Sequence, residues 1–352
     1  MTLLLTNEEV EQVLDMPAAL SALEPVYREL AEGGAVNRPQ SQTYLPGPLR
    51  GSSYCLKTVE GGAQALGAMA IRLTSDVLRS ETVDGVERRV KVPAAPGGRF
   101  LGLVLLFSTE NGSLLAILPD GIIQRLRVGA SSALAARAMA REDACVVGVI
   151  GAGAQAAAQL LGLALVRQVA SVRVFSPTAQ RRQSFAQRLG SELGIPVEAK
   201  ENPSAVVDGA DIVLAATNSA TPVIDAGWLQ GGMHIGFIRE FEMSDAVLAR
   251  ADRVITHTKQ GDIDHFTPVG QEQLAQTQRG RGIEWGRYPE LADVIAGRAP
   301  GRSGTDEVTL FMNNFGVGIQ FAALGTWAYQ RARERGLGYE MPDDWFLEAI
   351  QP

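Results

Sequence analysis

Three small residues near the middle of the chain have the spacing of a dinucleotide-binding turn. Gly151, Gly153 and Ala156 fit the pattern G-x-G-x-x-A, and the run VVGVI before them has the composition of a buried strand. The first glycine permits a tight turn, the second lets the backbone approach a pyrophosphate, and the small third residue lets a helix pack on the strand. The amides of Ala154 and Gln155, at the start of that helix, would bind the pyrophosphate. A purely structural turn would have the same spacing, so the motif gains weight only from its setting.

The residues after the next expected strand, SVRVFS, indicate which dinucleotide is preferred. A fold that selects NAD usually has Asp or Glu here, because the carboxylate binds the ribose 2′-hydroxyl. This chain has Ser176, Pro177 and Thr178, with Arg181 and Arg182 shortly afterwards. We expect Ser176 to cap the next helix and Pro177 to occupy its first position. NADP(H) is therefore favoured, and NAD(H) stays possible because both arginines could be solvated charges on the helix.

Alternating strands and helices must surround this turn if it binds a nucleotide. Beyond residue 120, strand-like runs alternate with helical patterns such as QRRQSFAQRLGSEL, and the runs are CVVGVI, SVRVFS, DIVLAAT, MHIGFI and DRVITHT. This alternation predicts a parallel sheet with helices on both faces. Ligands of such sheets collect at the carboxyl ends of the strands, so Thr217, at the end of DIVLAAT, is a further candidate for cofactor binding.

The first 120 residues have a different pattern. A helix is expected over residues 6–32, with Thr6 or Asn7 as its cap and Gly33 at its end. Short β-like pieces follow, and a hairpin turn is expected at Asn111-Gly112. The first part is thus predicted to be a sheet with a helix.

Farther along the chain, a helix of small residues is expected over 127–139, loops around one short helix over 260–306, and a helical tail over 311–335.

The composition limits the classes of function. The 352 residues suggest two domains, and with 46% hydrophobic and 20% charged residues both can bury cores. A net charge of −7 gives no basic surface for nucleic acid. We see no signal peptide and no apolar run long enough for a membrane span. With Cys55 and Cys145 as the only cysteines, the chain fits a reducing cytoplasm. The pattern suggests no metal site.

A long stretch around the glycine turn resembles the ornithine cyclodeaminase/mu-crystallin family. It comprises DGIIQRLRVGASSALAARAMA followed by VIGAGAQAAAQL, and the likeness continues through ELADVIAGRAPGR and FGVGIQFAALGTWAYQRARERGLG. The resemblance implies an α/β fold in which a Rossmann-type doubly wound parallel sheet (121–314) is inserted in an α+β substrate-binding and dimerisation domain (1–120 and 315–352). It also implies a homodimer that acts on small imine, amine or keto substrates with a nicotinamide cofactor.

The resemblance also suggests which residues bind the substrate. Arg127 matches the family arginine that binds the substrate carboxylate, which a guanidinium can bind bidentately. The family arginine that follows an early proline is replaced by Gln40, although Arg38 lies nearby. The family strand lysine is replaced by Arg72, which keeps the charge but cannot release a proton near neutral pH. Arg72 could hold a substrate anion or form a structural ion pair.

The candidates for proton transfer also depart from the family pattern. The aspartate of cyclodeaminases falls near Phe241, so the carboxylate would come from Glu240 or Glu242. His257, at the end of DRVITHT, could donate a proton or have no role. A weaker expectation is that two adjacent amides contact the substrate, namely Asn313 and Asn314.

These departures favour one function over two others. We expect an NAD(P)H-dependent imine or ketimine reductase, or an amino-acid dehydrogenase. The alternative is an ammonia-eliminating cyclodeaminase with bound NAD, and a non-catalytic nucleotide-binding protein of the crystallin type is the third possibility. The replaced lysine and aspartate argue against ornithine as the substrate.

Overall fold

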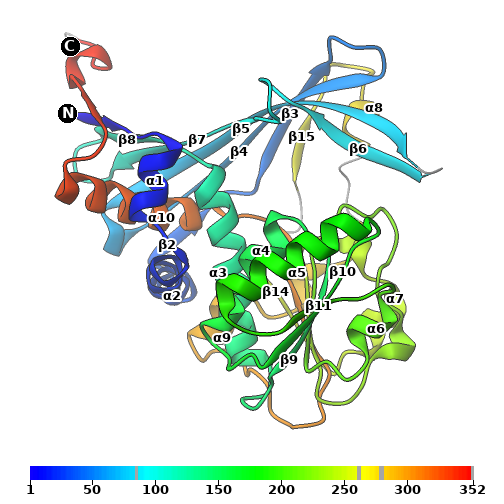
Figure 1. The fold of residues 1–352 in the computed structure, drawn as a ribbon. Coiled ribbons are helices and arrows are strands. Elements are labelled where there is room, and N and C mark those ends of the chain that lie inside the picture. Colours follow the sequence, from blue (N-terminus) through cyan, green and yellow to red (C-terminus); the bar gives the residue numbers. More distant parts are fainter. Residues whose placement is uncertain (84–85, 260–262, 277–280, 350–352) are drawn as a thin grey trace.

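The computed structural model describes residues 1–83, 86–259, 263–276 and 281–349, whose strands form two sheets. The seven-stranded sheet is parallel throughout (Figure 1). In spatial order its strands are β11 (Val197–Ala199), β10 (Ser171–Phe175), β9 (Val146–Ile150), β12 (Ile212–Ala215), β13 (His234–Phe237), β16 (Thr309–Met312) and β14 (Arg253–Thr256). The strand order reverses between β9 and β12, which is where ligands of doubly wound sheets bind. The predicted α/β fold class is confirmed.

Helices cover this sheet because its strands are apolar on both faces. Val147 and Val149 of β9 pack with Leu160 of the following helix and with Phe185 and Leu189 of the next one. The residues of β12, β13 and β16 are all buried. The helices of this part are α4 (Ala154–Ala164), α5 (Ala179–Leu193), α6 (Ser204–Val207), α7 (Asp245–Arg250) and α9 (Leu291–Ile295), and the 3-10 helices are η2 (Ala226–Trp228), η3 (Glu240–Glu242) and η4 (Trp285–Arg287).

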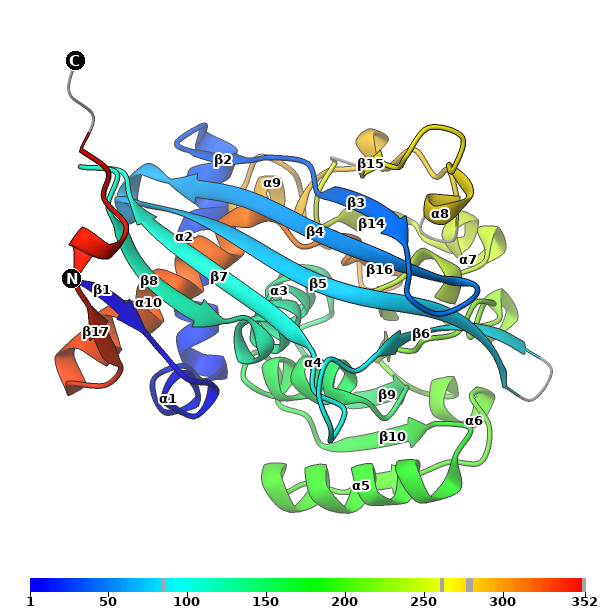
Figure 2. The same cartoon turned by 90° about the horizontal axis from the view of Figure 1, so that it is seen from above.

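The second sheet is largely antiparallel and has ten strands. Along its main path these are β15 (Asp264–Phe266), β3 (Ser41–Pro46), β4 (Ser52–Ala63), β5 (Ala68–Val83), β7 (Leu101–Ser108), β8 (Leu114–Pro119), β1 (Thr2–Leu4) and β17 (Tyr339–Met341), while β2 (Ala35–Asn37) pairs with β4 and β6 (Val86–Val92) with β5. The strands β4 and β5 extend as a long arm beyond the helices (Figure 2).

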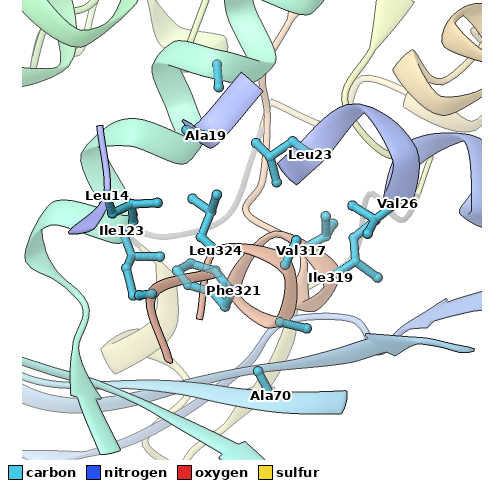
Figure 3. Close-up of a cluster of buried hydrophobic side chains, with 14 of the residues drawn as sticks. Leu14, Ala19, Leu23, Val26, Ala70, Ile123, Val317, Ile319, Phe321 and Leu324 are labelled. Carbon is cyan, nitrogen blue, oxygen red and sulfur yellow. The ribbon is translucent and has the colours of Figure 1, made fainter. Parts of the chain in front are cut away.

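One face of this sheet carries a helical layer and the main core. The layer consists of α10 (Gly318–Arg335), α2 (Met16–Glu32), α1 (Asn7–Val13) and the start of α3 (Gly121–Met139). Phe321 and Leu324 of α10 meet Leu23 of α2 and Ile123 of α3 above Ala70 of the sheet (Figure 3). A β-carbon on Gly318 would lie 2.0 Å from the Glu60 carbonyl carbon, so only glycine lets α10 begin directly against β4.

The structure corrects several expected element boundaries. The expected opening helix is two helices, because the chain is extended at Leu14 and Asp15, and Asp15 caps α2. The expected helical tail begins as strand β16. The helix of small residues begins at Gly121, six residues before the expected start. The segment 264–266, inside the range expected for the nucleotide domain, pairs with β3 of the other sheet. Short helices also occur at α8 (Gln273–Gln276), η1 (Gln64–Leu66) and η5 (Asp343–Trp345).

The described helices include none that combines the length and the apolar character needed to cross a bilayer.

Candidate active site

The glycine turn opens onto a cavity of about 900 Å³. Gly151 has φ +116°, and a β-carbon there would lie 2.2 Å from the Ala216 carbonyl oxygen, so the close approach of β9 to β12 requires glycine. A β-carbon on Gly153 would meet no atom within 4 Å, so the backbone is open to the cavity at this point. The N-cap residue of α4 is Gly153, which has no side chain to cap the helix, so the first amides of α4 are available to an anion. This arrangement fits a dinucleotide pyrophosphate.

One wall of the cavity is formed by residues that come after strand β10 in the sequence. Ser176, Thr178 and Arg181 all line it. Arg182, in contrast, is hydrogen-bonded to the backbone, since its Nη1 donates to the Ser176 carbonyl oxygen at 3.1 Å. The prediction that Ser176 caps the helix is wrong: α5 begins at Ala179, and Thr178 is its N-cap residue. The lining on this side thus presents hydroxyl groups and one guanidinium.

Glu242 joins two loops at the carboxyl ends of β12 and β13. Its carboxylate is fully buried and accepts hydrogen bonds from the amides of Thr217, Ile238 (3.2 Å) and Arg239 (3.0 Å). Desolvation raises the pKa of Glu242, and the amide bonds oppose this effect. Since Thr217 lines the cavity, Glu242 orders part of the cavity wall from behind.

Glu240 is also bonded to protein groups. Its carboxylate accepts from the indole Nε1 of Trp285 at 2.5 Å and from the amide of Arg281 at 2.7 Å. The side chain therefore ties η3 to the segment before η4. Gln155, the remaining cofactor candidate, has a buried Oε1 with no hydrogen-bond partner among the described residues.

His257 lies in a buried hydrogen-bond network between the two parts of the molecule. Its Nδ1 faces the Phe315 carbonyl oxygen and must carry the proton, so Nε2 accepts from the Tyr27 hydroxyl at 2.7 Å. Gln320 donates to Tyr27 at 3.0 Å and to Ser131 at 2.8 Å. Burial, and then the charge of Arg127, lower the pKa of His257 to about 3, and burial raises that of Tyr27 to about 12. Both groups are thus neutral near pH 7.

Arg127 and Arg72 converge on the ring of Phe321. Their Cζ atoms lie 5.9 Å and 5.5 Å from the ring centroid. Arg72 donates from Nε to the Asp120 carboxylate at 2.7 Å, so the structural ion pair considered for Arg72 is present. Arg127 donates to the Gln124 amide oxygen at 3.2 Å and has no carboxylate partner among the described residues. Burial, and then the charge of Arg72, lower its pKa to about 9. A bound anion would stabilise this guanidinium.

Arg127 lies near the edge of the parallel sheet that carries the cavity. Its guanidinium contacts Gly316, which follows β16 just as Thr217 follows β12. Helices α3 and α4 pack closely, since a β-carbon on Gly129 would lie 2.3 Å from the Ala158 carbonyl oxygen. This contact fixes Arg127 relative to the glycine turn that precedes α4.

The other expected substrate contacts have structural partners. Arg38 pairs with Glu60 at 2.9 Å, and the Gln40 carbonyl oxygen accepts from the amide of Asp264. Asn313 donates to Ser132 and to the Val128 carbonyl oxygen, both at 3.2 Å, and so holds α3 against β16. Asn314 pairs through its amide with the backbone of Thr258.

Sequence reasoning missed three residues at this site: Tyr27, Asp120 and Phe321. An acidic residue directly before a helix predicts a cap, but Asp120 makes no capping hydrogen bond and pairs with Arg72 instead. Tyr27 and Phe321 lie on apolar helix faces and give no signal that separates them from the core.

Comparison with known proteins identifies relatives of similar sequence and fold. Delta(1)-pyrroline-2-carboxylate reductase of Bacillus cereus is 28% identical over 242 residues, which cover 67% of this chain and 73% of that protein. The solved structure of the Thermococcus litoralis enzyme of that name, with NADH and L-proline, has a TM-score of 0.78 and 25% identity, with 97% of this chain and 100% of that one covered. The iminosuccinate reductase of Paracoccus denitrificans with NAD⁺ has a TM-score of 0.77 and 25% identity, with 97% and 99% covered. The model of the ornithine cyclodeaminase/mu-crystallin family matches residues 1–336, and the chain belongs to that family.

Proposed function

We propose that this protein is a nicotinamide-dependent reductase of imines that carry a carboxylate, or a dehydrogenase of the corresponding amino acids in reverse. The observation that carries the proposal is the buried Arg127 guanidinium, which has no carboxylate partner among the described residues and contacts Gly316, in the loop at the carboxyl end of β16 in the sheet that carries the dinucleotide cavity. A guanidinium binds a carboxylate bidentately and would recover the desolvation cost of the charge. The named activities of the two imine-reducing relatives support this proposal.

We propose NADP(H) as the preferred cofactor. The wall beyond β10 carries Ser176, Thr178 and Arg181, and Asp225, the acidic residue of the lining, follows β12 instead. A 2′-phosphate on the ribose would find a cation and hydroxyl groups there, and no carboxylate would repel it.

The residues of the chain have separate roles in this proposal. The bound nicotinamide supplies or accepts the hydride. Arg127 binds the substrate carboxylate, and Arg72, fixed by Asp120, adds positive charge beside it. Glu242 orders the Thr217 loop. His257 acts as a positioning residue: it accepts from Tyr27, and Gln320 donates to both Tyr27 and Ser131, whose hydroxyl donates to the Arg127 carbonyl oxygen at 2.7 Å.

A substrate panel tests the reductase proposal. Cyclic imines with a carboxylate, and 2-oxo acids mixed with amines, are supplied with NADPH, and the loss of NADPH absorbance is followed. We expect oxidation that depends on the imine. An inert panel, with NADPH bound but not oxidised, would support a nucleotide-binding protein without this activity.

The cyclodeaminase alternative predicts a different result, which is tested with ornithine as the substrate. Ornithine with catalytic NAD would release proline and ammonia without net change in the cofactor. Arg72 and Phe241 stand where that chemistry has its lysine and aspartate in the family pattern, so we expect little conversion. Efficient release of both products, at about 1 per second or faster as in ordinary enzymes, would favour the lyase.

A further inference from the structure

The three residues expected to handle a proton are all committed to other contacts. Reduction of an imine leaves an electron pair on nitrogen that needs a proton. Glu242 accepts hydrogen bonds from three backbone amides, and Glu240 accepts hydrogen bonds from Trp285 and Arg281. Both ring nitrogens of the buried His257 are hydrogen-bonded as well. Arg72 faces Asp120 and cannot release a proton near neutral pH. The proton donor must therefore lie elsewhere in the cleft.

Lys57 lies on the same face of the sheet as Arg72. Strands β4 and β5 are antiparallel, with Val59 opposite Arg72 and Lys57 opposite Thr74. Lys57 and Arg72 are thus diagonal neighbours, whose backbones lie about 7–8 Å apart in such sheets, within reach of long side chains. Helix α10 covers part of this face of the sheet. Lys57 lies farther along the same face, and its side chain is 15% exposed.

Charged and polar groups lie beside Lys57. Its Nζ lies 3.9 Å from the carboxylate of Asp76, a side chain only 1% exposed, which also pairs with Lys91 at 2.9 Å. The buried Thr74 hydroxyl has no hydrogen-bond partner among the described residues. Lys57, Asp76 and Lys91 form one charged cluster, and the Thr74 hydroxyl can bond to a substrate or a water.

We infer that Lys57 is a catalytic residue of the proposed reductase and donates the proton to the imine nitrogen. The imine carbon receives hydride from the reduced nicotinamide, and the electron pair of the C=N π bond moves to nitrogen. That nitrogen takes a proton from Nζ of Lys57, which leaves a neutral amine on the lysine and an oxidised nicotinamide. Lys57 then regains its proton from water. In the reverse direction, neutral Lys57 takes the proton from the substrate ammonium. This inference rests on the proposed function.

A structural explanation makes a different prediction. If Lys57 only neutralises Asp76, an arginine would serve equally well, because it keeps the charge. If Lys57 donates a proton, arginine fails, since it holds its proton too strongly. Lys57→Arg therefore separates the two roles, and Lys91→Met is the matched control because it removes the other cation paired with Asp76.

The kinetic experiment compares these variants with the wild-type protein on an imine from the panel. We expect kcat to fall about 100-fold or more in Lys57→Arg and Lys57→Ala, the scale of general acid catalysis, with NADPH affinity and thermal unfolding unchanged. Added ethylamine should restore part of the rate in Lys57→Ala. Lys91→Met should stay within about threefold of the wild-type rate. Full activity in Lys57→Arg, or an equal loss in Lys91→Met, would overturn the inference.

A second readout does not depend on turnover. The chain has four lysines, Lys57, Lys91, Lys200 and Lys259, so ¹³C-methylation of lysine amines gives a simple NMR spectrum. The signal missing in Lys57→Arg identifies Lys57. It should shift when the amine product is added, whereas the Lys91 signal should not, and an unmoved Lys57 signal at saturating product contradicts the inference. If the wild-type protein reduces no imine, the proposed function itself fails, and this inference fails with it.

Discussion

The guanidinium of Arg127 lies flat against Gly316. A β-carbon at residue 316 would lie 3.0 Å from Cζ and from both terminal nitrogens, closer than carbon atoms normally approach. Glycine at this position therefore lets the loop after β16 support the arginine. The backbone at Gly316 and the Phe321 ring, whose centroid lies 5.9 Å from Cζ, limit the directions from which a carboxylate can meet the guanidinium.

Gly316→Ala should weaken substrate binding without unfolding the protein. The added methyl group must displace the guanidinium by a few tenths of an ångström, at a cost of about 1–3 kcal/mol, as for other overpacked sites. We expect KM for a carboxylate-bearing imine to rise about tenfold while NADPH affinity is unchanged. Gly325→Ala is the control, because its β-carbon would lie 3.6 Å from Leu106 in ordinary contact. If KM is the same in both variants, the position of the Arg127 guanidinium does not determine substrate binding.

Arg127→Ala should abolish turnover and leave the cofactor bound. The side chain has no carboxylate partner among the described residues, so its loss breaks no ion pair and removes only the group proposed to bind the substrate. Steady-state kinetics and NADPH titration by fluorescence measure the two effects separately. A variant that keeps its affinity for an acidic substrate would show that the carboxylate binds elsewhere. Activity only on substrates without a carboxylate would also contradict the proposal that Arg127 binds a substrate carboxylate.

Arg181→Ala should reduce the preference for NADP(H). The residue lines the cavity beyond β10, so its loss should narrow the affinity difference between NADPH and NADH by about 1–3 kcal/mol, as for a hydrogen bond to a charged group. Arg188→Ala on the same helix is the control, because Arg188 pairs with Glu192 at the surface. Wild-type protein with equal affinity for both cofactors would contradict the proposed preference.

His257→Gln should make stability less dependent on pH. The folded protein holds the pKa of His257 at about 3, below the usual 6.5. Between these pH values the unfolded chain binds a proton that the folded protein does not, so this contribution is present above pH 6.5 and is lost on acidification. Denaturant unfolding from pH 4 to 7 should show a slope smaller by about 1 kcal/mol per pH unit in the variant. Identical slopes would mean that His257 is protonated in the folded state.

The outer face of the ten-stranded sheet should form a homodimer interface. Ile71 and Leu73 of β5 pair with Leu105 and Leu103 of β7, and on this face no described helix covers them (Figure 2). These half-buried side chains form a contiguous apolar surface, and such surfaces mark association sites. We expect a dimer by light scattering, and Leu105→Glu should shift it toward monomer. Leu165→Glu, at an exposed leucine of the other sheet's layer, should not. A wild-type monomer at micromolar concentration would contradict the interface.

The parallel sheet was largely predictable from the sequence, whereas the details of the site were not. Runs such as DIVLAAT are short and apolar on both faces, and their alternation with helical patterns is typical of buried parallel strands. The role of Glu242 depends on Thr217, which is 25 residues away, and that of His257 on Tyr27, 230 residues away. Such pairings arise from tertiary packing, which local spacing does not reveal. Ser176 before Pro177 predicts a helix cap, but the helix begins later, at Ala179.

The pairing of β15 with β3 affects how the two parts of the protein can move. The chain crosses between them near Asp120 and again near Asn314, and these two crossings alone could act as a hinge. The segment 264–266 adds a third connection, because it leaves the nucleotide-binding part and adds to the edge of the other sheet. Wide opening of the cleft would have to separate these strands. Substrates are therefore expected to enter and leave through side-chain and loop motion, with little rotation of one domain relative to the other.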